Sequence, residues 1–364
     1  MQVGWHVGDL NHCGNLALNE FSMYYCDQHN GVVRQIGLET GESKVLVTGL
    51  RRPYGLAVSA DDKSLFVCEV NGHGVKHIVI ATGEMTNVAG YEGTFQHPHG
   101  IALDKEEKLL YITDICHHQV HQLHLETGVL SAFPGMRGNF NCIEKPLGVA
   151  VTRKGTVFVS EYDGGNNHRR IRQVDMATGS VHTLAGGLCG NEDGVGEAAQ
   201  FGRVGSLCLS ADDSTLFAAD VENKNIRAID IRTRTVKTVV DKVVSANGHS
   251  CNVAVIGCKL VVGAGSIVQC LPLPEEYCTK LVLTLEVSPQ SSGEEHIAKL
   301  RFLSLGGEER VTILHDPNSD LMDRIWEDMR RAIGNETAVS VVLPDGNLVE
   351  NNEDLTKAIC SAFP

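Results

Sequence analysis

Histidines crowd one stretch of this sequence. Residues 97–128 hold six of the sixteen histidines of the 364-residue chain. Imidazole nitrogens are common ligands of zinc and other transition metals, so this stretch is one candidate for a metal site. The other interpretation is that it is one unit of a repeat, whose remaining residues then recur elsewhere. The six are His97, His99, His117, His118, His121 and His124.

The chain does repeat itself around these histidines. The segment 98–103, PHGIAL, returns as PYGLAV at 53–58 and as PLGVAV at 146–151. Each copy continues into a polar turn and an apolar run that ends in an acid, and most copies then reach a Thr-Gly turn. Short strands at such a spacing are typical of β-propeller blades, which bury both faces only when neighbours stack around an axis. The acids are Asp27, Glu69, Asp114, Glu161 and Asp220.

These repeats predict a mainly β fold, with a six-bladed propeller over residues 1–276. The sixth copy, residues 251–274, contains only three strand-like runs. We expect residues 1–7 to pair with it as a fourth strand, because an unpaired sheet edge is a liability that propellers avoid by closing the ring. An insert at 186–201 lengthens one loop and elaborates one face.

The repeated residues resemble a known family. The motif Pro-x-Gly-[Ile/Leu/Val]-Ala-[Val/Leu], the strand ending in an acid, the polar loop with Asn and His or Arg, and the Thr-Gly turn are similar to the NHL repeat. The resemblance covers residues 1–276 and implies a propeller of the NHL type. It implies no single function, because NHL propellers serve as RNA-binding, protein-binding and enzymatic scaffolds.

Two sets of charged residues occupy equivalent places in the repeat, and equivalent places form a ring on one face of a propeller. The loop leading into the first strand of each copy carries a basic or titratable residue. These residues are His12, Arg52, His97, Lys145, Arg203 and His249, with His99 close by. The strand-ending acids form a second ring. Either each acid bonds a neighbouring loop, or the rings frame a shallow site for an anion or a peptide carboxylate.

Four of the crowded histidines fall on the same face of the expected propeller. His97 and His99 begin a first strand, and His117 and His118 follow a second strand, so these four are the candidate metal ligands. The remaining two, three residues apart on one strand, point to opposite faces and do not share a metal.

The segment around His99 also resembles one blade of the peptidylglycine amidating lyase propeller. In that family the residue after the motif proline binds zinc in each contributing blade, which the resemblance maps to Tyr54, His99, Leu147 and Gly205. Only one of these four is a metal ligand, so we expect no zinc-lyase site and no cofactor. A gluconolactonase-type calcium site needs carboxylates and amides, and residues of those types are Glu161, Asn166, Asn167 and Asp220.

A second unit follows the propeller, because residues 279–364 hold 15 acidic against 8 basic side chains and lack the repeat. Two strand-like runs are followed by SDLMDRIWEDMRRAIG, whose apolar stripe predicts a helix, and then by further short strands. This order resembles a ubiquitin-like β-grasp domain, and implies a small α+β fold. The chain ends in CSAFP rather than Gly-Gly, so conjugation to lysine is not expected.

The composition narrows the classes of function. A net charge of −14 disfavours nucleic-acid binding, and no apolar run is long enough to span a membrane. Twelve scattered cysteines without a CxxC motif favour a reducing, cytoplasmic location. We expect a non-catalytic scaffold that binds protein partners within a larger complex. It would bind them through the C-terminal unit and through the loop face, by which we mean the propeller face that carries the two rings of charged residues. The alternative is a propeller enzyme resembling peptidylglycine amidating lyase, gluconolactonase or strictosidine synthase, with a divalent metal in the central pore.

Overall fold

The chain forms two compact units, Met1–Pro272 and Leu273–Pro364, in a computed structural model. The structure describes residues 3–6, 13–18, 22–37, 42–90, 94–133, 143–163, 168–243, 251–256, 259–264, 267–272, 280–292, 295–304, 309–315, 338–342 and 348–349. Each unit is described separately below.

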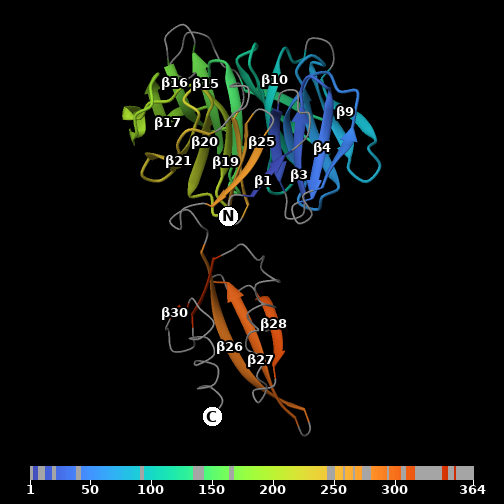
Figure 1. Cartoon of the computed structure of the whole chain (residues 1–364), viewed down its shortest axis with the longest axis vertical. Helices are drawn as coiled ribbons and strands as arrows, with labels where there is room; N and C mark the ends of the chain where they lie inside the picture. The colour runs from blue at the N-terminus through green and yellow to red at the C-terminus, as the bar shows by residue number, and fades with distance from the viewer. Residues whose placement is uncertain are drawn as a thin grey trace. The chain divides into compact units, whose positions relative to one another are not determined.

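The first unit is a β-propeller (Figure 1), as the repeats predict. Five sheets are antiparallel meanders, each drawn from one continuous stretch of chain, and we number them blades 1 to 5. Blade 1 comprises β2 (Cys13–Leu18), β3 (Ser22–Asp27), β4 (Val32–Gly37) and β5 (Ser43–Val47). Blade 2 comprises β6 (Pro53–Val58), β7 (Ser64–Glu69), β8 (Gly74–Val79) and β9 (Met85–Ala89).

The next three blades follow the same order. Blade 3 comprises β10 (Pro98–Leu103), β11 (Leu109–Asp114), β12 (Gln119–His124) and β13 (Leu130–Phe133). Blade 4 comprises β14 (Pro146–Val151), β15 (Val157–Asp163), β16 (His168–Val174) and β17 (Val181–Leu188). Blade 5 comprises β19 (Val204–Leu209), β20 (Thr215–Asp220), β21 (Asn225–Asp230) and β22 (Thr235–Val240), with the short β18 (Gly194–Val195) added outside β22.

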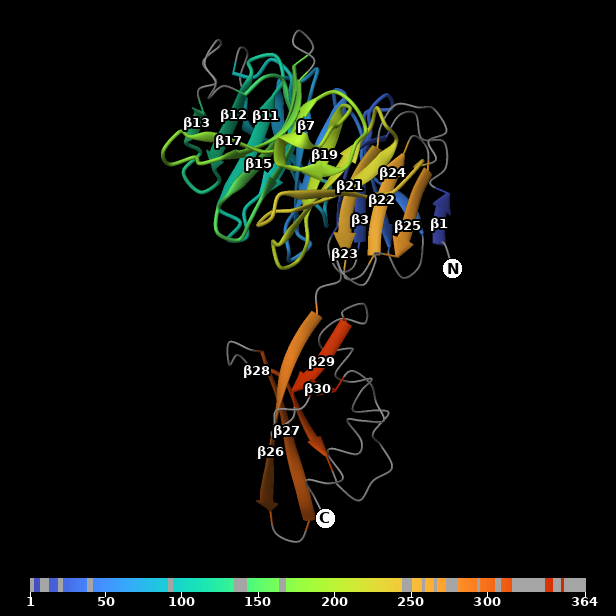
Figure 2. The same ribbon diagram turned by 90° about the vertical axis from the view of Figure 1, so that its left-hand side faces the viewer.

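Five blades are therefore found, where the repeat predicts six. A further four-stranded sheet is composite: β1 (Val3–His6) lies beside β25 (Ile267–Pro272), followed by β24 (Lys259–Ala264) and β23 (Cys251–Ile256), as Figure 2 shows. In this sheet Val3 is opposite Cys270 and His6 is opposite Ile267. The two ends of the propeller sequence thus meet in one sheet.

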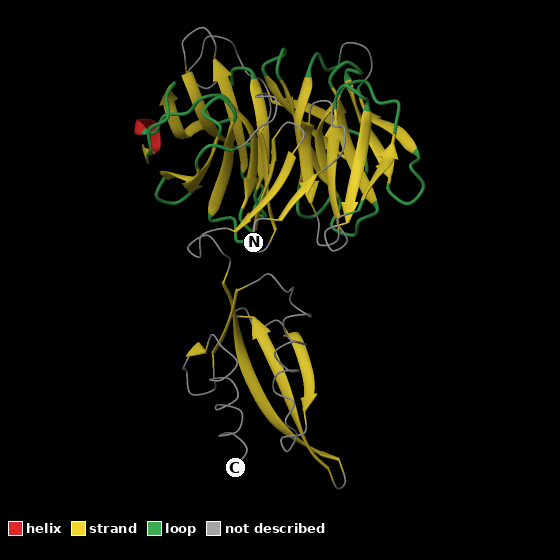
Figure 3. Cartoon of the chain, viewed as in Figure 1, coloured by secondary structure: helices red, strands yellow, loops and turns green. Residues whose placement is uncertain are grey.

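The apolar cores lie between blades, because each blade covers the face of its neighbour. The strands β3 and β20 bury all six of their residues, which explains why they are apolar on both sides. One cluster packs Tyr24 and Val33 of blade 1 against Leu56 and Leu65 of blade 2. Helix is almost absent from the described residues, with one 3-10 turn, η1 (Gly196–Ala198), shown in Figure 3.

The motif glycine allows the first strands of adjacent blades to touch. A Cβ atom on Gly55 would lie 2.1 Å from the carbonyl oxygen of His99, and one on Gly100 would lie 2.3 Å from that of Leu147. Real Cβ atoms do not approach so closely, so these positions require glycine for its missing side chain. The recurring Pro-x-Gly motif is thus a packing requirement of the ring.

Hydroxyl groups connect the same first strands across blade boundaries. Thr113 Oγ1 accepts a hydrogen bond from the Gly100 amide at 2.8 Å and donates to the Leu147 carbonyl of the next blade at 2.7 Å. Ser160 repeats this arrangement one blade further on, donating to the Val204 carbonyl at 2.9 Å. In the composite sheet the buried Asn252 amide donates to the Gly14 carbonyl of blade 1, which ties the last sheet to the first blade.

The second unit contains a separate five-stranded sheet. Its strands are β26 (Lys280–Ser292), β27 (Glu295–Ser304), β28 (Glu309–His315), β29 (Ala338–Val342) and β30 (Leu348–Val349), in the order β28-β27-β26-β29-β30. The pairing of β26 with β29 is parallel and the other pairings are antiparallel. The helix expected at 319–334 lies outside the described residues. Among the described residues of the whole chain, no helix has the length and apolar content needed to cross a membrane.

Deleting residues 1–7 should destabilise the propeller, because the deletion removes β1 and exposes the edge of β25. We expect a lower melting temperature and a loss of several kcal/mol in the free energy of unfolding. Thermal melts followed by circular dichroism measure this. Deleting Gln2 alone, which precedes β1, is the control, and an equal melting temperature for all three proteins would show that the pairing contributes nothing.

Candidate functional site

The strand-ending acids are buried, and the acids of blades 2 to 5 hold the loops that lead into their own blades. All five residues are at most 5% exposed. Glu69 Oε1 accepts the Arg51 amide at 2.7 Å, Asp114 accepts the amides of Gln96 and His97 at 2.7 and 3.0 Å, and Asp220 accepts the Gly202 amide at 2.8 Å. Glu161 accepts the Glu144 amide at 3.3 Å. These four acids therefore accept hydrogen bonds from loop backbone, as in the first of the two interpretations of the sequence.

Each acid also faces a basic position on the third strand of its blade. The position is the second residue after the acid's cross-strand partner, and it is held by Arg34, Lys76, His121, Arg172 and Arg227. Arg172 lies 2.9 Å from Glu161, Lys76 lies 3.8 Å from Glu69, and Arg227 lies 3.9 Å from Asp220. A buried carboxylate needs such compensation, because an unpaired charge away from water is costly.

Burial and hydrogen bonding act in opposite directions on the pKa values of these acids. Burial alone would raise the pKa of Asp114, but the amides of His97, Gln96 and His117 outweigh it, so the net pKa is lowered. For Asp220 burial dominates, and the pKa is raised despite the Gly202, Asn223 and Arg227 contacts. Among the cationic positions, burial lowers the pKa of His121, with Asp114 opposing.

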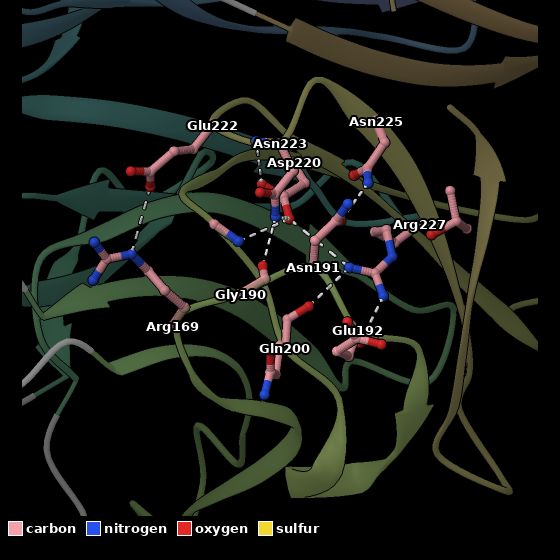
Figure 4. A network of polar contacts seen from close by, with 12 residues as sticks. Arg169, Gly190, Asn191, Glu192, Gln200, Asp220, Glu222, Asn223, Asn225 and Arg227 are labelled. Carbon is pink, nitrogen blue, oxygen red and sulfur yellow. Dashed lines mark hydrogen bonds and ion pairs between the residues drawn. The ribbon is translucent and has the colours of Figure 1, made fainter. Parts of the chain in front are cut away.

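The insert is anchored to blade 5 by a polar network (Figure 4). The fully buried Arg227 donates to the carbonyls of Gln200 and Glu192 at 2.8 and 3.1 Å, and to Asp193 Oδ1 at 2.6 Å. Asn223 Nδ2 donates to the Gly190 carbonyl at 2.6 Å. The insert is thus part of the blade, where β18 extends the sheet, rather than a free recognition loop.

The basic lead-in residues surround a histidine on the loop face. Arg52 and Arg203 are exposed, and His97 and Lys145 are half-buried. The charges of Arg203, Arg52 and His97 all reach His99, where each lowers the pKa of its imidazole. Neither Arg52 nor Arg203 makes an ion pair with any described residue. His12 and His249, the other two expected members of the ring, lie outside the described residues.

His99 is an uncharged member of this face. Burial lowers its pKa to about 3, against the hydrogen bond to the Leu147 carbonyl, and its ring packs on Tyr54 with centroids 3.6 Å apart. The ordinary titration of histidine near pH 6.5 therefore does not apply to His99. Tyr54 and His99 instead form a tilted aromatic pair next to the cations.

The four histidines proposed as metal ligands point to different partners. His97 Nδ1 lies 3.0 Å from Cys116 Sγ, and His118 Nδ1 lies 3.3 Å from Glu144 Oε2. His117 Nδ1 lies 3.0 Å from Asp114 Oδ2. With His99 packed on Tyr54, the structure does not gather the four at one point.

The two carboxylates that the sequence suggested for a calcium site bond other groups of the protein. Glu161 bonds Arg170 and Arg172, and Asp220 bonds Gly202 and Asn223. The other two candidates, Asn166 and Asn167, lie outside the described residues. A polar hollow in the described surface lies on the opposite face, at turns that include Lys154 and Asp175. The loop face itself carries exposed cations and an aromatic pair, which suit an anionic ligand.

Sequence reasoning missed the basic position of the third strand. It recurs seven residues after the acid in four of the five blades, but the longer loop of blade 4 moves it to residue 172. A search for a basic residue at that offset would have found most of the set. The strand β18 and its pairing with β22 had no signal in the sequence, because two residues carry no periodicity.

Comparison with known proteins agrees with the repeat and the fold. Residues 95–123 match the NHL repeat family. A segment of 90 residues is 34% identical to Protein SUPPRESSOR OF QUENCHING 1, chloroplastic, of Arabidopsis thaliana. That segment is 24% of this chain and 8% of that protein, so the chain spans less than a tenth of the curated relative it matches.

Solved propellers share the architecture at low sequence identity. A protein of unknown function from Bacteroides thetaiotaomicron is 15% identical with a TM-score of 0.61, covering 74% of this chain and 72% of its own. A gluconolactonase from Xanthomonas campestris is 16% identical with a TM-score of 0.57, covering 72% and 86%. A chain of a nidogen/laminin complex is 14% identical with a TM-score of 0.52, covering 78% and 90%. These similarities define a β-propeller fold.

Replacing Arg227 by Met should destabilise blade 5 by about 3–5 kcal/mol at pH 7, because Asp220 is left as a buried charge without its cation. The raised pKa of Asp220 rises further in this variant, so the loss should shrink as the pH falls through that pKa and the carboxyl is protonated. Urea unfolding at several pH values measures both effects. The exposed Arg232→Met is the control, and an equal loss in both variants at every pH would contradict the pairing.

Proposed function

We propose that this chain is a non-catalytic protein-binding scaffold whose propeller takes an acidic segment of a partner protein on its loop face. The observation that supports this most directly is the pair of exposed guanidinium groups, Arg52 and Arg203, without an ion pair among the described residues. Guanidinium groups bind carboxylates with two parallel hydrogen bonds, which gives both affinity and orientation.

The surroundings of these arginines favour a carboxylate-bearing ligand. Lys145 lies on the same face, with its ammonium 5.5 Å from the Tyr162 ring, and the guanidinium of Arg169 lies 4.1 Å from the same ring. Because the acids of the repeat are buried and bonded to backbone, they do not neutralise the exposed cations. Exposed cations without an acidic partner are a local exception on a chain of net charge −14, and they would attract anionic segments.

The alternative is a propeller enzyme. One of the similar folds is a gluconolactonase, and that likeness, at 16% identity, favours the fold alone. Lactone hydrolysis by the purified chain in the presence of calcium or zinc would replace the scaffold proposal.

Three further elements belong to this proposal. We count the composite sheet of β1, β25, β24 and β23 as the sixth blade, which its pairings support. We assign the second unit a ubiquitin-like β-grasp fold that recognises a partner, supported by the parallel pairing of β26 with β29 in a mixed sheet. We place the protein in the cytoplasm, in a larger complex, on the composition of the sequence.

The double variant Arg52→Glu, Arg203→Glu should weaken binding of a fluorescent oligo-glutamate peptide by at least about tenfold, or about 1.4 kcal/mol. Fluorescence anisotropy at low salt measures the affinity, and added salt should weaken the wild-type complex because the charges are exposed. His99 should add no pH dependence to the binding between pH 8 and pH 5, because the pKa of its ring is about 3.

The matched control is Lys154→Glu, Arg232→Glu, which makes the same charge change at exposed turns of the opposite face. Equal weakening by the two double variants would show attraction to net charge rather than to the loop face. Complete absence of binding by the wild-type protein would exclude an acidic peptide as the ligand.

A further inference from the structure

Blade 3 departs from the charge pattern of the other blades. Where Glu69, Glu161 and Asp220 face a lysine or an arginine within 4 Å, Asp114 faces His121. Guanidinium and ammonium groups carry their charge at all physiological pH values, whereas an imidazole in water is mostly uncharged at pH 7. The carboxylate of blade 3 therefore lacks the permanent cation that Glu69, Glu161 and Asp220 have.

The side chain of His121 is buried and has no hydrogen-bond partner. It is 4% exposed, and neither Nδ1 nor Nε2 has a partner. The imidazole ring packs against the ring of Phe95 in an edge-to-face arrangement, with the two centroids 4.8 Å apart. A buried polar atom without a hydrogen-bond partner costs free energy, and the lone pair of a neutral imidazole nitrogen can be satisfied by a metal ion as well as by a hydrogen-bond donor.

Asp114, His117 and His121 bring three ligand atoms together. One atom from each residue lies within 4.8 Å of the other two. In a tetrahedral zinc site, with bonds of about 2.0–2.2 Å, ligand atoms are about 3.4 Å apart, so a modest rotation of side chains closes the set. His117 is suited to that movement, because it lies in the loop after β11 and its side chain is 36% exposed.

The Asp114 carboxylate is already oriented for metal binding. Its Oδ1 accepts the amides of His97, Cys116 and His117 at 3.0, 3.2 and 3.2 Å, which fixes the plane of the group. Its Oδ2 lies 3.0 Å from His117 Nδ1. Metal-binding carboxylates are commonly held in this way by surrounding hydrogen bonds, which reduces the entropy lost on metal binding.

We propose that Asp114, His117 and His121 bind a zinc ion, which provides in blade 3 the positive charge that lysine or arginine provides in the other blades. Two imidazoles and one carboxylate match the donor preference of zinc, whereas calcium and magnesium prefer oxygen ligands. A water molecule from the exposed side of His117 completes four ligands. The role of the ion is to fix the loop 115–118, and it is independent of the proposed binding of acidic peptides.

Zinc titration of the full chain, first stripped of metal by a chelator, tests this proposal. Isothermal calorimetry should show one zinc per chain, a large excess of calcium or magnesium should not compete, and zinc should raise the melting temperature. Cobalt(II) in place of zinc should give visible absorption bands of a four-coordinate site with nitrogen and oxygen ligands.

The decisive variant is His121→Arg, which introduces the residue found at this position in blades 1, 4 and 5. It should fold, bind zinc at least about 100-fold more weakly, and lose the rise in melting temperature with zinc. His117→Ala should also lose zinc while keeping the fold. His124→Ala and His97→Ala, which remove neighbouring imidazoles from outside the set, should bind zinc as the wild type does.

Three results would overturn the proposal. The first is a wild-type chain that binds no zinc at stoichiometric concentration. The second is unchanged zinc binding by His121→Arg, which would reveal adventitious binding to surface histidines. The third is equal loss in His121→Arg and His124→Ala, which would place the ion elsewhere on the strand. Binding of acidic peptide is measured separately with the Arg52 and Arg203 variant, so failure of one proposal does not mimic failure of the other.

Discussion

The propeller depends on a buried carboxylate at the end of the second strand of each blade. This group is taken out of water and is made tolerable by two kinds of partner: backbone amides of the incoming loop and, in most blades, a cation on the third strand. Glu161 shows both, with the Glu144 amide at 3.3 Å and Arg172 at 2.9 Å. Charge-assisted hydrogen bonds of this kind are strong in an interior without water. If the carboxylate loses its partner, it remains as a buried charge whose desolvation is no longer compensated.

This constraint determines what the loop face offers to a ligand. Because the acids of the repeat are buried and bonded inside the blades, they leave basic groups such as Arg52 and Arg203 exposed on this face. The backbone of these lead-in loops is fixed by the same acids, so the cations stand on an anchored frame rather than on free loops. A fixed array loses less entropy on binding than a mobile one, which favours the loop face as a recognition surface.

Much of the fold follows from residues that are visible in the sequence. The Pro-x-Gly motif predicts the contact between first strands, since Gly100 leaves no room for a Cβ beside Leu147. For the strand-ending acids the sequence left two interpretations open, and Glu69, Asp114, Glu161 and Asp220 follow the one in which the acid bonds a loop. Cross-strand register is harder to read from sequence, because it depends on loop length, and for that reason the pairing of Glu161 with Arg172 was not foreseen. The contact between His99 and Tyr54 joins two blades, and no local pattern encodes it.

The central claim is that buried carboxylates fasten the loops of the ring, and amide hydrogen exchange tests it most directly. The amides of Arg51, His97, Glu144 and Gly202 belong to loop segments but donate to Glu69, Asp114, Glu161 and Asp220. The account predicts that they exchange as slowly as amides within the blade strands, because opening them requires the carboxylate to lose its partners. Exchange as fast as that of the exposed turns on the opposite face would contradict it.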